Sequence, residues 1–300
     1  MTYCILYNPH AGNGRGEAAA CRLTELLPND ELLVRDITKI HDYGTFFAAL
    51  GDNVRVVLAG GDGTLNRFIN DTASLALGRD IYYFATGSGN DFLTDIGGKA
   101  GDAPRQINEY LRNLPSVYVN GTRRYFLNGV GYGIDGYCCL EGDRQRETSA
   151  KPVNYTSIAV KGLLFHYKPT SAVVTVDGTE HRYKHVWLAP TMNGRYYGGG
   201  MIPTPQQDRL AQPKRLSVMV FRSPGKLKAL AVFPSIFKGE HVRHTGVVEI
   251  LTGRDITVEF DRPTPLQIDG ETVPGVTSYR AVACAETPVE ENNAQSIAAV

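Results

Sequence analysis

The chain has 300 residues and 42% hydrophobic content, which is enough for two domains with sizeable cores. Its 31 basic and 31 acidic residues cancel, so the overall charge does not favour nucleic acid as a partner. The five cysteines form no CxxC pair, which favours free thiols in a reducing cytosol. The apolar run at residues 3–7 is too short for a signal peptide, and no stretch approaches the roughly 20 apolar residues that span a bilayer.

The first part of the chain alternates short apolar runs with helical patterns. Strands are predicted at residues 3–7, 31–34, 54–59 and 81–85, and helices at residues 17–27 and 65–77. Strand and helix in alternation indicate a parallel sheet with helices on its faces. The expected fold of residues 1–122 is therefore a parallel α/β domain.

The pattern changes after about residue 122. Alternating β-rich runs predict strands at residues 124–128, 172–176, 185–189, 216–221, 246–251, 256–260 and 279–284. Two helices are expected near residues 154–166 and 226–237. Residues 123–284 are thus predicted to form an antiparallel β-sandwich domain, and the polar segment of about 285–300 is expected to fray or to pack back on the first domain.

Three glycine-rich turns follow predicted strands of the first domain, at residues 8–16, 60–64 and 86–92. Loops after parallel strands meet at one edge of the sheet, where ligands bind. Glycine lets backbone N–H groups approach a phosphate closely, and the following helix N-terminus favours negative charge. Neither a Walker A loop nor a GxGxxG dinucleotide fingerprint is present, which weakens an NAD(H)-dependent dehydrogenase as an interpretation.

Six motifs extend this pattern along nearly the whole chain. They are Asn8-Pro9 with Gly12, Gly60-Gly61-Asp62-Gly63-Thr64, Gly87-Ser88-Gly89-Asn90-Asp91-Phe92, Gly133-Ile134-Asp135-Gly136, Asn193-Gly194 with Gly198-Gly199-Gly200-Met201, and Asp269-Gly270-Glu271. In this order they resemble the NPxxG, GGDGT, GTGNDF, GFD, NGxxxGGGM and DGE segments of the diacylglycerol kinase catalytic domain family. Ser88 replaces a threonine of that pattern.

The resemblance implies a soluble, bacterial-type lipid kinase that uses ATP and Mg²⁺ to phosphorylate diacylglycerol, giving phosphatidic acid for phospholipid biosynthesis. The α/β domain would bind ATP and the second domain the lipid. Such an enzyme is expected in the cytoplasm, peripheral at the inner membrane face, and as a homodimer if it assembles. Kinases of a sphingoid base or of phosphatidylglycerol, and a catalytically silent nucleotide-binding regulator, stay open as alternatives, whereas NAD kinase is disfavoured by the later motifs.

The resemblance also assigns site residues. It implies Asp269 as general base, with Glu271 beside it as a second catalytic group that orients Asp269 or holds a metal-bound water. Asp62, Asp91 and Asp208 are the candidate Mg²⁺ ligands. The implied nucleotide contacts are Asn8, Gly12, Gly61, Asp62, Gly63, Thr64, Gly87, Ser88 and Asn90.

Two segments depart from the family pattern. Residues 116–120 contain no acidic residue, although soluble members carry one near the entry to the second domain. At residues 205–213 a segment that the family links to a structural magnesium site keeps only Asp208 as a plausible side-chain ligand.

Residue pattern alone leaves two points open. Asp269-Gly270 and Asp177-Gly178 are both typical of a tight hairpin turn, so the family order, not the local pattern, favours Asp269 as the catalytic one. The helical stretch at residues 226–238 has lysines beside one apolar face, formed by Leu227, Leu230, Phe233 and Phe237. Such a face fits an anionic membrane surface, but packing onto the second domain is the favoured interpretation.

Overall fold

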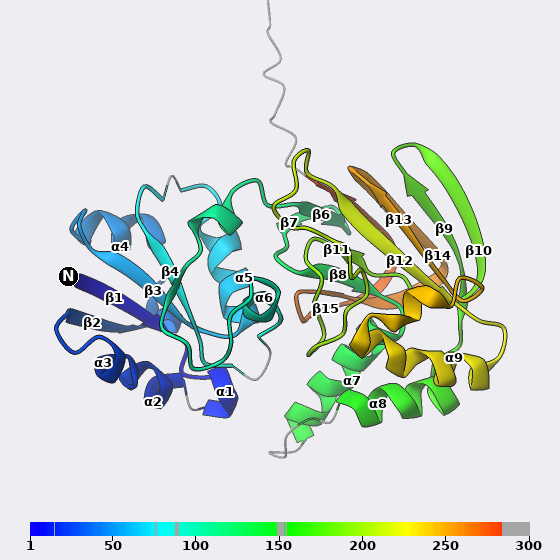
Figure 1. Cartoon of the computed structure of the whole chain (residues 1–300), viewed down its shortest axis with the longest axis horizontal. Coiled ribbons are helices and arrows are strands. Elements are labelled where there is room, and N and C mark those ends of the chain that lie inside the picture. The colour runs from blue at the N-terminus through cyan, green and yellow to red at the C-terminus, as the bar shows by residue number, and fades with distance from the viewer. Residues whose placement is uncertain (15, 76, 88–89, 149–152, 154, 284–300) are drawn as a thin grey trace, which may run out of the picture.

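A computed structural model describes residues 1–14, 16–75, 77–87, 90–148, 153 and 155–283. Two β-sheets lie side by side, each with its own helices (Figure 1). The predicted combination of an α/β half and an antiparallel β half is confirmed. The last residue of the strand expected at residues 279–284, together with Ser88 and the segment of about 285–300, lies outside the described residues.

The first sheet has the strand order β2-β1-β3-β4-β5. The first four strands are parallel, and the short β5 pairs antiparallel with β4. Four expected strands are present within two residues of their predicted bounds. The strands are β1 (Thr2–Tyr7), β2 (Glu31–Asp36), β3 (Arg55–Gly60), β4 (Ile81–Ala85) and β5 (Arg105–Gln106).

Helices cover both faces of this sheet because successive strand residues point to opposite sides. Ile5 and Val57 pack in one apolar cluster with Leu23, whereas Cys4 and Val56 pack in another with Phe47 and Phe68. The helices are α1 (Ala11–Gly14), α2 (Gly16–Cys21), α3 (Leu23–Leu26), α4 (Tyr43–Ala49), α5 (Asp62–Asp71) and α6 (Asp91–Asp95), with the 3-10 turns η1 (Ile37–Lys39) and η2 (Asn108–Leu111).

Two helix predictions in this half were wrong in detail. The single helix expected at residues 17–27 is two short helices, α2 and α3, interrupted at Arg22. Helix α5 starts three residues before the expected position, because Gly61 is its N-cap, and it ends at Asp71 rather than near residue 77. The Thr72 hydroxyl donates to the Phe68 carbonyl and so competes with continuation of the helix.

The second sheet contains ten antiparallel strands and closes on itself, because β14 pairs with both β8 and β9. The predicted sandwich is therefore barrel-like, and β6 and β7 already belong to this sheet. Its strands are β6 (Ser116–Val119), β7 (Thr122–Tyr125), β8 (Gly129–Tyr132), β9 (Thr170–Val176), β10 (Thr179–Leu188), β11 (Thr191–Met192), β12 (Leu216–Arg222), β13 (Val248–Gly253), β14 (Asp255–Ile268) and β15 (Glu271–Val282).

Helix α7 (Ile134–Thr148) was not predicted. Its sequence contains Gly136 and Gly142, which lower helix propensity, and β-favouring residues such as Tyr137. Tertiary packing explains both glycines. A Cβ atom on Gly136 would lie 2.0 Å from the Pro265 carbonyl oxygen, and one on Gly142 would lie 2.7 Å from the Tyr155 ring.

The two helices that were predicted in this half are present. The first is α8 (Tyr155–Lys161), continued by the π-helical segment η3 (Gly162–His166). The second is α9 (Lys226–Val232), continued by the 3-10 segments η4 (Phe233–Lys238) and η5 (Glu240–Arg243). None of the helices in the described part of the chain has the length and apolar character needed to cross a bilayer.

Candidate active site

The three glycine-rich loops of the first half meet at the carboxyl edge of its sheet. The Asn8 side-chain amide donates to the Thr64 hydroxyl at 2.9 Å, which joins the first loop to the second. The Thr86 N–H donates to the Gly60 carbonyl at 2.9 Å, which joins the second loop to the third. The predicted nucleotide residues on the described part of the three loops are thus brought together.

The glycines of the second loop differ in what surrounds them. A Cβ atom on Gly60 would lie 2.5 Å from Thr64 Cβ, so this glycine is needed for the tight turn itself. At Gly63 no described atom lies within 4 Å of a Cβ position. At this position the first turn of the ten-residue helix α5 is not crowded by described residues outside the helix, as an incoming phosphate would require.

Two polar atoms of the third loop are buried without a hydrogen-bond partner among the described residues. They are the Thr86 hydroxyl oxygen and Asn90 Oδ1. The Asn90 amide nitrogen donates to the Gly87 carbonyl at 3.0 Å, which fixes the side chain with its oxygen free. Buried polar groups are nearly always paired, so these two oxygens are candidates to contact a polar ligand.

Asp62, the first residue of α5, contacts residues of both halves of the protein. Its Oδ2 atom accepts from the Phe92 N–H at 3.2 Å and from the Asn128 side-chain amide at 3.0 Å. Burial is the main cause that raises the pKa of Asp62 from 3.8 to about 7, and the neighbouring charges of Asp91 and Asp269 add to it. This carboxyl group therefore sits in an excess of negative charge that a cation would relieve.

Asp91 is held by the glycine-rich segment of the second half. The Gly199 and Gly200 N–H groups donate to its two carboxylate oxygens at 2.8 and 2.7 Å. These glycines have φ values of 82° and 103°, in the left-handed region that other residues avoid. Burial raises the pKa of Asp91, while the two N–H groups oppose the rise.

Asp269 occupies the two-residue turn between β14 and β15. Its Oδ1 atom accepts from the backbone N–H groups of Asn128 and Gly129 at 2.8 and 2.9 Å. Its Oδ2 atom accepts from the Leu127 N–H and, at 2.6 Å, from the side-chain amide of Asn66 on α5. Burial raises the pKa of Asp269 despite these donors. The Asp269 carboxylate of the second half thereby contacts helix α5 of the first half.

The two Asp-Gly turns have the same backbone form and different surroundings. Asp269 and Gly270 have φ values of 46° and 93°, and Asp177 and Gly178 have 49° and 83°. Two consecutive positive φ angles are typical of the type I′ hairpin turn. Asp177 accepts from the Arg254 and Asp255 N–H groups at an exposed sheet end. Only tertiary contacts distinguish the two turns.

The remaining predicted acids lie apart from this cluster. Glu271 forms an ion pair with Arg124 on β7. Asp208 is exposed, and its carboxylate accepts from the Leu210 N–H. No group of three or more His, Cys, Asp or Glu residues with metal-binding geometry occurs among the described residues.

A buried ion pair that was not predicted from the sequence joins the halves. Arg209, 6% exposed, donates through Nε to Asp95 at the end of α6. It also donates to the Leu127 carbonyl at 3.3 Å and to Asn128 Oδ1 at 3.1 Å. Asn128 in turn holds Asp62. Gly194 leaves the space for this guanidinium, since a Cβ atom there would lie 2.1 Å from an Arg209 nitrogen.

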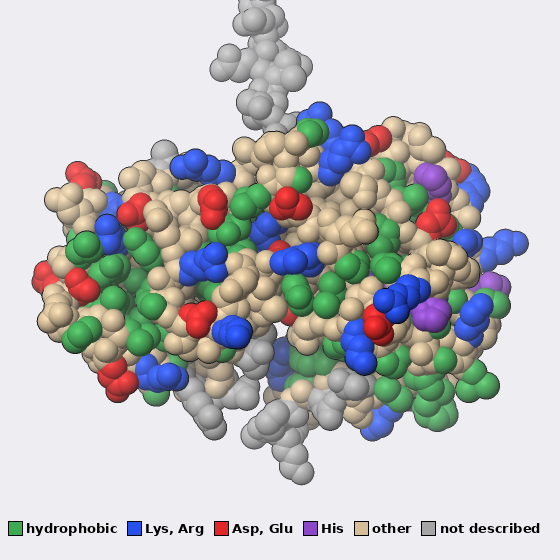
Figure 2. Space-filling model, viewed as in Figure 1, with side chains coloured by type: hydrophobic (Ala, Val, Ile, Leu, Met, Phe, Trp, Pro, Cys, Tyr) green, Lys and Arg blue, Asp and Glu red, His purple; other side chains and the backbone are tan. Residues whose placement is uncertain are grey.

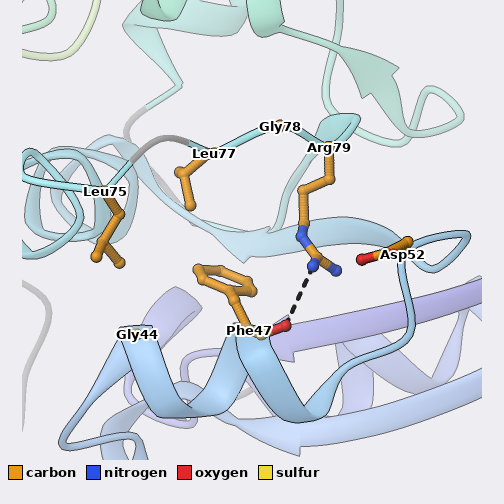
Figure 3. A pocket seen from close by; sticks show the side chains of 7 residues that line it. All are labelled: Gly44, Phe47, Asp52, Leu75, Leu77, Gly78 and Arg79. Atoms are coloured by element: carbon orange, nitrogen blue, oxygen red, sulfur yellow. Dashed lines mark hydrogen bonds between the residues drawn. The ribbon is translucent and has the colours of Figure 1, made fainter.

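Two surface hollows accompany these features. One, of about 340 Å³, is lined by Asp95, Arg195 and Arg209 and lies beside the ion pair. The other, of about 390 Å³, lies between α4 and the segment before β4, where Arg79 donates to the Phe47 carbonyl at 3.1 Å (Figure 3). The second hollow contains none of the predicted site residues.

The raised pKa of Asp62 predicts how stability depends on pH. Between pH 3.8 and about 7 the folded protein keeps a proton on this group that the unfolded chain has lost. The stabilisation is complete below this range and is lost as the pH rises through about 7. Without ligand, we expect the Tm of the wild type minus the Tm of Asp62→Asn to decrease as the pH is raised from 5 to 8.

Thermal unfolding followed by circular dichroism measures this difference. Asp71→Asn on the same helix, where Asp71 forms an exposed ion pair with Arg67, serves as the control. A Tm difference between wild type and Asp62→Asn that stays constant over this pH range would contradict the prediction.

Comparison with known proteins identifies the family. Residues 2–117 match the diacylglycerol kinase catalytic domain, and residues 128–285, more than half of the chain, match the YegS C-terminal NAD kinase beta sandwich-like domain. A Mycobacterium tuberculosis protein named diacylglycerol kinase is 27% identical over 270 residues, covering 86% of this chain and 84% of its own. A Bacillus subtilis protein of the same name is 25% identical over 246 residues, covering 78% of each chain.

A solved structure supports the fold. The crystal structure titled as a diacylglycerol kinase from Bacillus anthracis aligns with a TM-score of 0.61 at 19% identity, over 94% of each chain. Both the family matches and the fold extend across the two halves. The chain therefore belongs to the diacylglycerol kinase family and is a kinase that transfers phosphate to an alcohol group.

Proposed function

We propose that this kinase phosphorylates a lipid hydroxyl, that of diacylglycerol, with ATP as phosphoryl donor and phosphatidic acid as product. The contact that carries the proposal is the hydrogen bond between Asp269 and Asn66. It places a carboxylate of the second half beside the helix that starts at the Gly60–Thr64 loop. The proposed proton acceptor and the proposed phosphate-binding loop would thus share one site.

The nucleotide would bind along the three loops. Backbone N–H groups at Gly61, Gly63 and Thr64, at the start of α5, would donate to phosphate oxygens. Asn8, Gly12, Gly87 and Asn90 line the adjoining loops, and Ser88 is proposed with them from the sequence. The unpaired oxygens of Thr86 and Asn90 add two buried polar contacts.

The acids at this edge fit Mg²⁺ better than a structural metal cage. Mg²⁺ needs only one or two carboxylates when phosphates and waters complete its shell. Asp62 Oδ1 accepts from the Tyr83 hydroxyl at a long 3.4 Å, so Asp62 is the preferred ligand, and Asp91 is proposed as a ligand through water. When bound, the ion would neutralise charge on the transferring phosphate. Exposed Asp208 is not supported as its ligand.

Asp269 is proposed as the general base. The substrate O–H proton passes to an Asp269 oxygen as the substrate oxygen forms its bond to the γ-phosphorus and the bond to the ADP oxygen breaks. The raised pKa makes the carboxylate a better acceptor. Of its four donors, Asn66 is the one side chain, so its amide is the donor that can rotate away. Glu271, paired with Arg124, is proposed to fix the far end of the turn.

The lipid part of the proposal follows the names of the relatives, of which several are called diacylglycerol kinase and others "putative lipid kinase". It includes peripheral contact with the inner membrane face and access to cytoplasmic ATP. A sphingoid base and phosphatidylglycerol are the alternative acceptors within the same chemistry.

Transfer of labelled γ-phosphate tests the proposal. The full chain is incubated with ATP and Mg²⁺ and a panel of diacylglycerol, sphingoid base and phosphatidylglycerol in mixed micelles. We expect labelled phosphatidic acid, and no product when EDTA removes the metal. If only another lipid is labelled, that lipid is the acceptor in place of diacylglycerol. Nucleotide binding with no transfer to any lipid would favour the silent regulator.

A further inference from the structure

Two apolar side chains stand out of the surface where α8 and α9 meet. Phe165 on η3 is 73% exposed and Leu227 on α9 is 79% exposed. The two segments touch, because the Lys226 ammonium group donates to the Leu164 carbonyl at 2.8 Å. Figure 2 shows hydrophobic side chains gathered at the lower right, over the region of α8 and α9 in Figure 1.

The helices themselves are firmly anchored, so these side chains are not loose core residues. Ala229 and Val232 of α9 pack in one apolar cluster with Ile158 of α8 and Phe221 of β12. Helix α9 thus packs onto the second half, as favoured from the sequence, with Leu227 on its free side. Leu227 and Phe165 therefore remain exposed on well-packed helices, at the place where the two segments touch.

The charge around this face has one sign. Residues 155–168 and 224–239 contain five lysines and no aspartate or glutamate, in a chain whose net charge is zero. Lys161, Lys226 and Lys228 are exposed beside the two apolar side chains. On the neighbouring helix α7 the acids Glu141 and Asp143 form ion pairs with arginines of their own helix. The excess positive charge therefore remains for a partner.

We propose that Val160, Lys161, Phe165, Lys226, Leu227 and Lys228 form a docking face for an anionic lipid bilayer. Exposed aromatic and leucine side chains enter the boundary between headgroups and acyl chains, and lysines at their rim bind anionic headgroups. A partner protein would need matching acids, while an anionic bilayer supplies them over any contact area. The inference rests on the proposed lipid substrate and specifies how the enzyme reaches it.

The docking face belongs to the same rigid unit as the proposed base. Helix α8 packs on α7, and the Thr272 hydroxyl at the start of β15 donates to Asp143 of α7 at 2.8 Å. Asp269 lies three residues before Thr272. Docking would hold the catalytic turn at a fixed height above the membrane.

Co-flotation with vesicles tests the docking face. The full chain is mixed with vesicles of phosphatidylcholine alone or with phosphatidylglycerol added. We expect binding only to the anionic vesicles. Phe165→Ser/Leu227→Ser should weaken it at least tenfold, and Lys161→Gln/Lys228→Gln by more than tenfold, at about fivefold per lysine. Leu26→Ser, which removes a 41% exposed leucine from α3, should bind as the wild type does.

Activity separates this inference from the proposed function. On a short-chain diacylglycerol dispersed in detergent, the Phe165/Leu227 variant should keep wild-type turnover, and on anionic vesicles it should lose it. Vesicle binding by this folded variant at the wild-type level would overturn the docking face. A wild type that forms dimers through these residues and binds no vesicle would overturn it also, in favour of a second copy. Vesicle binding without turnover of any lipid would refute the function alone.

Discussion

Replacement of Asp269 by asparagine is expected to lower kcat about 10²–10⁴-fold, the usual contribution of general-base catalysis. Asparagine tolerates the left-handed conformation that this position adopts, with φ of 46°, so the turn is kept while the proton acceptor is lost. The KM for ATP should change little, because Asp269 is proposed to act on the lipid hydroxyl. Initial rates of labelled phosphate transfer measure both constants.

Asp177→Asn is the matched control for this prediction. Asp177 has φ of 49° in the second Asp-Gly turn, where its carboxylate accepts two backbone N–H groups on an exposed sheet end. The same chemical change in the same type of turn should leave kcat unchanged. An equal loss in both variants would show that asparagine damages the barrel, and full activity of Asp269→Asn would refute its role as base.

Replacement of Arg209 by alanine is expected to destabilise the protein by about 3–5 kcal/mol, because it removes the buried one of the two arginines that pair with the buried Asp95 carboxylate. The Asp95 side chain is 3% exposed and loses its buried partner. The same change removes the donor to Asn128, which holds Asp62, so kcat should also fall. Urea unfolding gives the free energy, and phosphate transfer by the folded variant gives kcat.

Arg195→Ala is the control for Arg209, since both arginines pair with Asp95. The Arg195 side chain is 41% exposed, and exposed ion pairs contribute only about 0–1 kcal/mol. Arg209→Lys should recover part of the stability, because a lysine supplies the charge but not the several fixed donors of a guanidinium. Equal losses for Arg195→Ala and Arg209→Ala would mean that burial does not decide the strength of these pairs.

Local pattern was sufficient for the parallel sheet and the position of its loops. Buried apolar runs that alternate with helical stretches leave one arrangement in which loops at residues 8, 61 and 86 meet at the same sheet edge. The helix limits were less well predicted. Packing and capping contacts such as those of Gly61 and Thr72 fix where a helix begins and ends.

The hydrophobic pattern did not predict helix α7, whose composition is unfavourable for a helix. Helix α7 contains two glycines, which lower its helix propensity. Both are required by tertiary packing, because the Pro265 carbonyl and the Tyr155 ring occupy the space that a Cβ atom would need. In the sequence, the lysines of residues 226–238 indicated that this helix could face an anionic membrane. The position of Phe165 beside α9 was not predictable from the sequence. Phe165 lies more than 60 residues away in the chain, and the two segments meet only in the folded protein.

The amino-acid sequence by itself determined the loops, the order of the motifs and the two Asp-Gly turns, because these depend on contacts between near neighbours in the chain. Tertiary structure decided what each turn does. Asp269 meets Asn66 and three backbone N–H groups, whereas Asp177 meets a sheet end. It also decided that Arg209 is buried against Asp95, because burial and charge pairing depend on which distant residues surround a side chain.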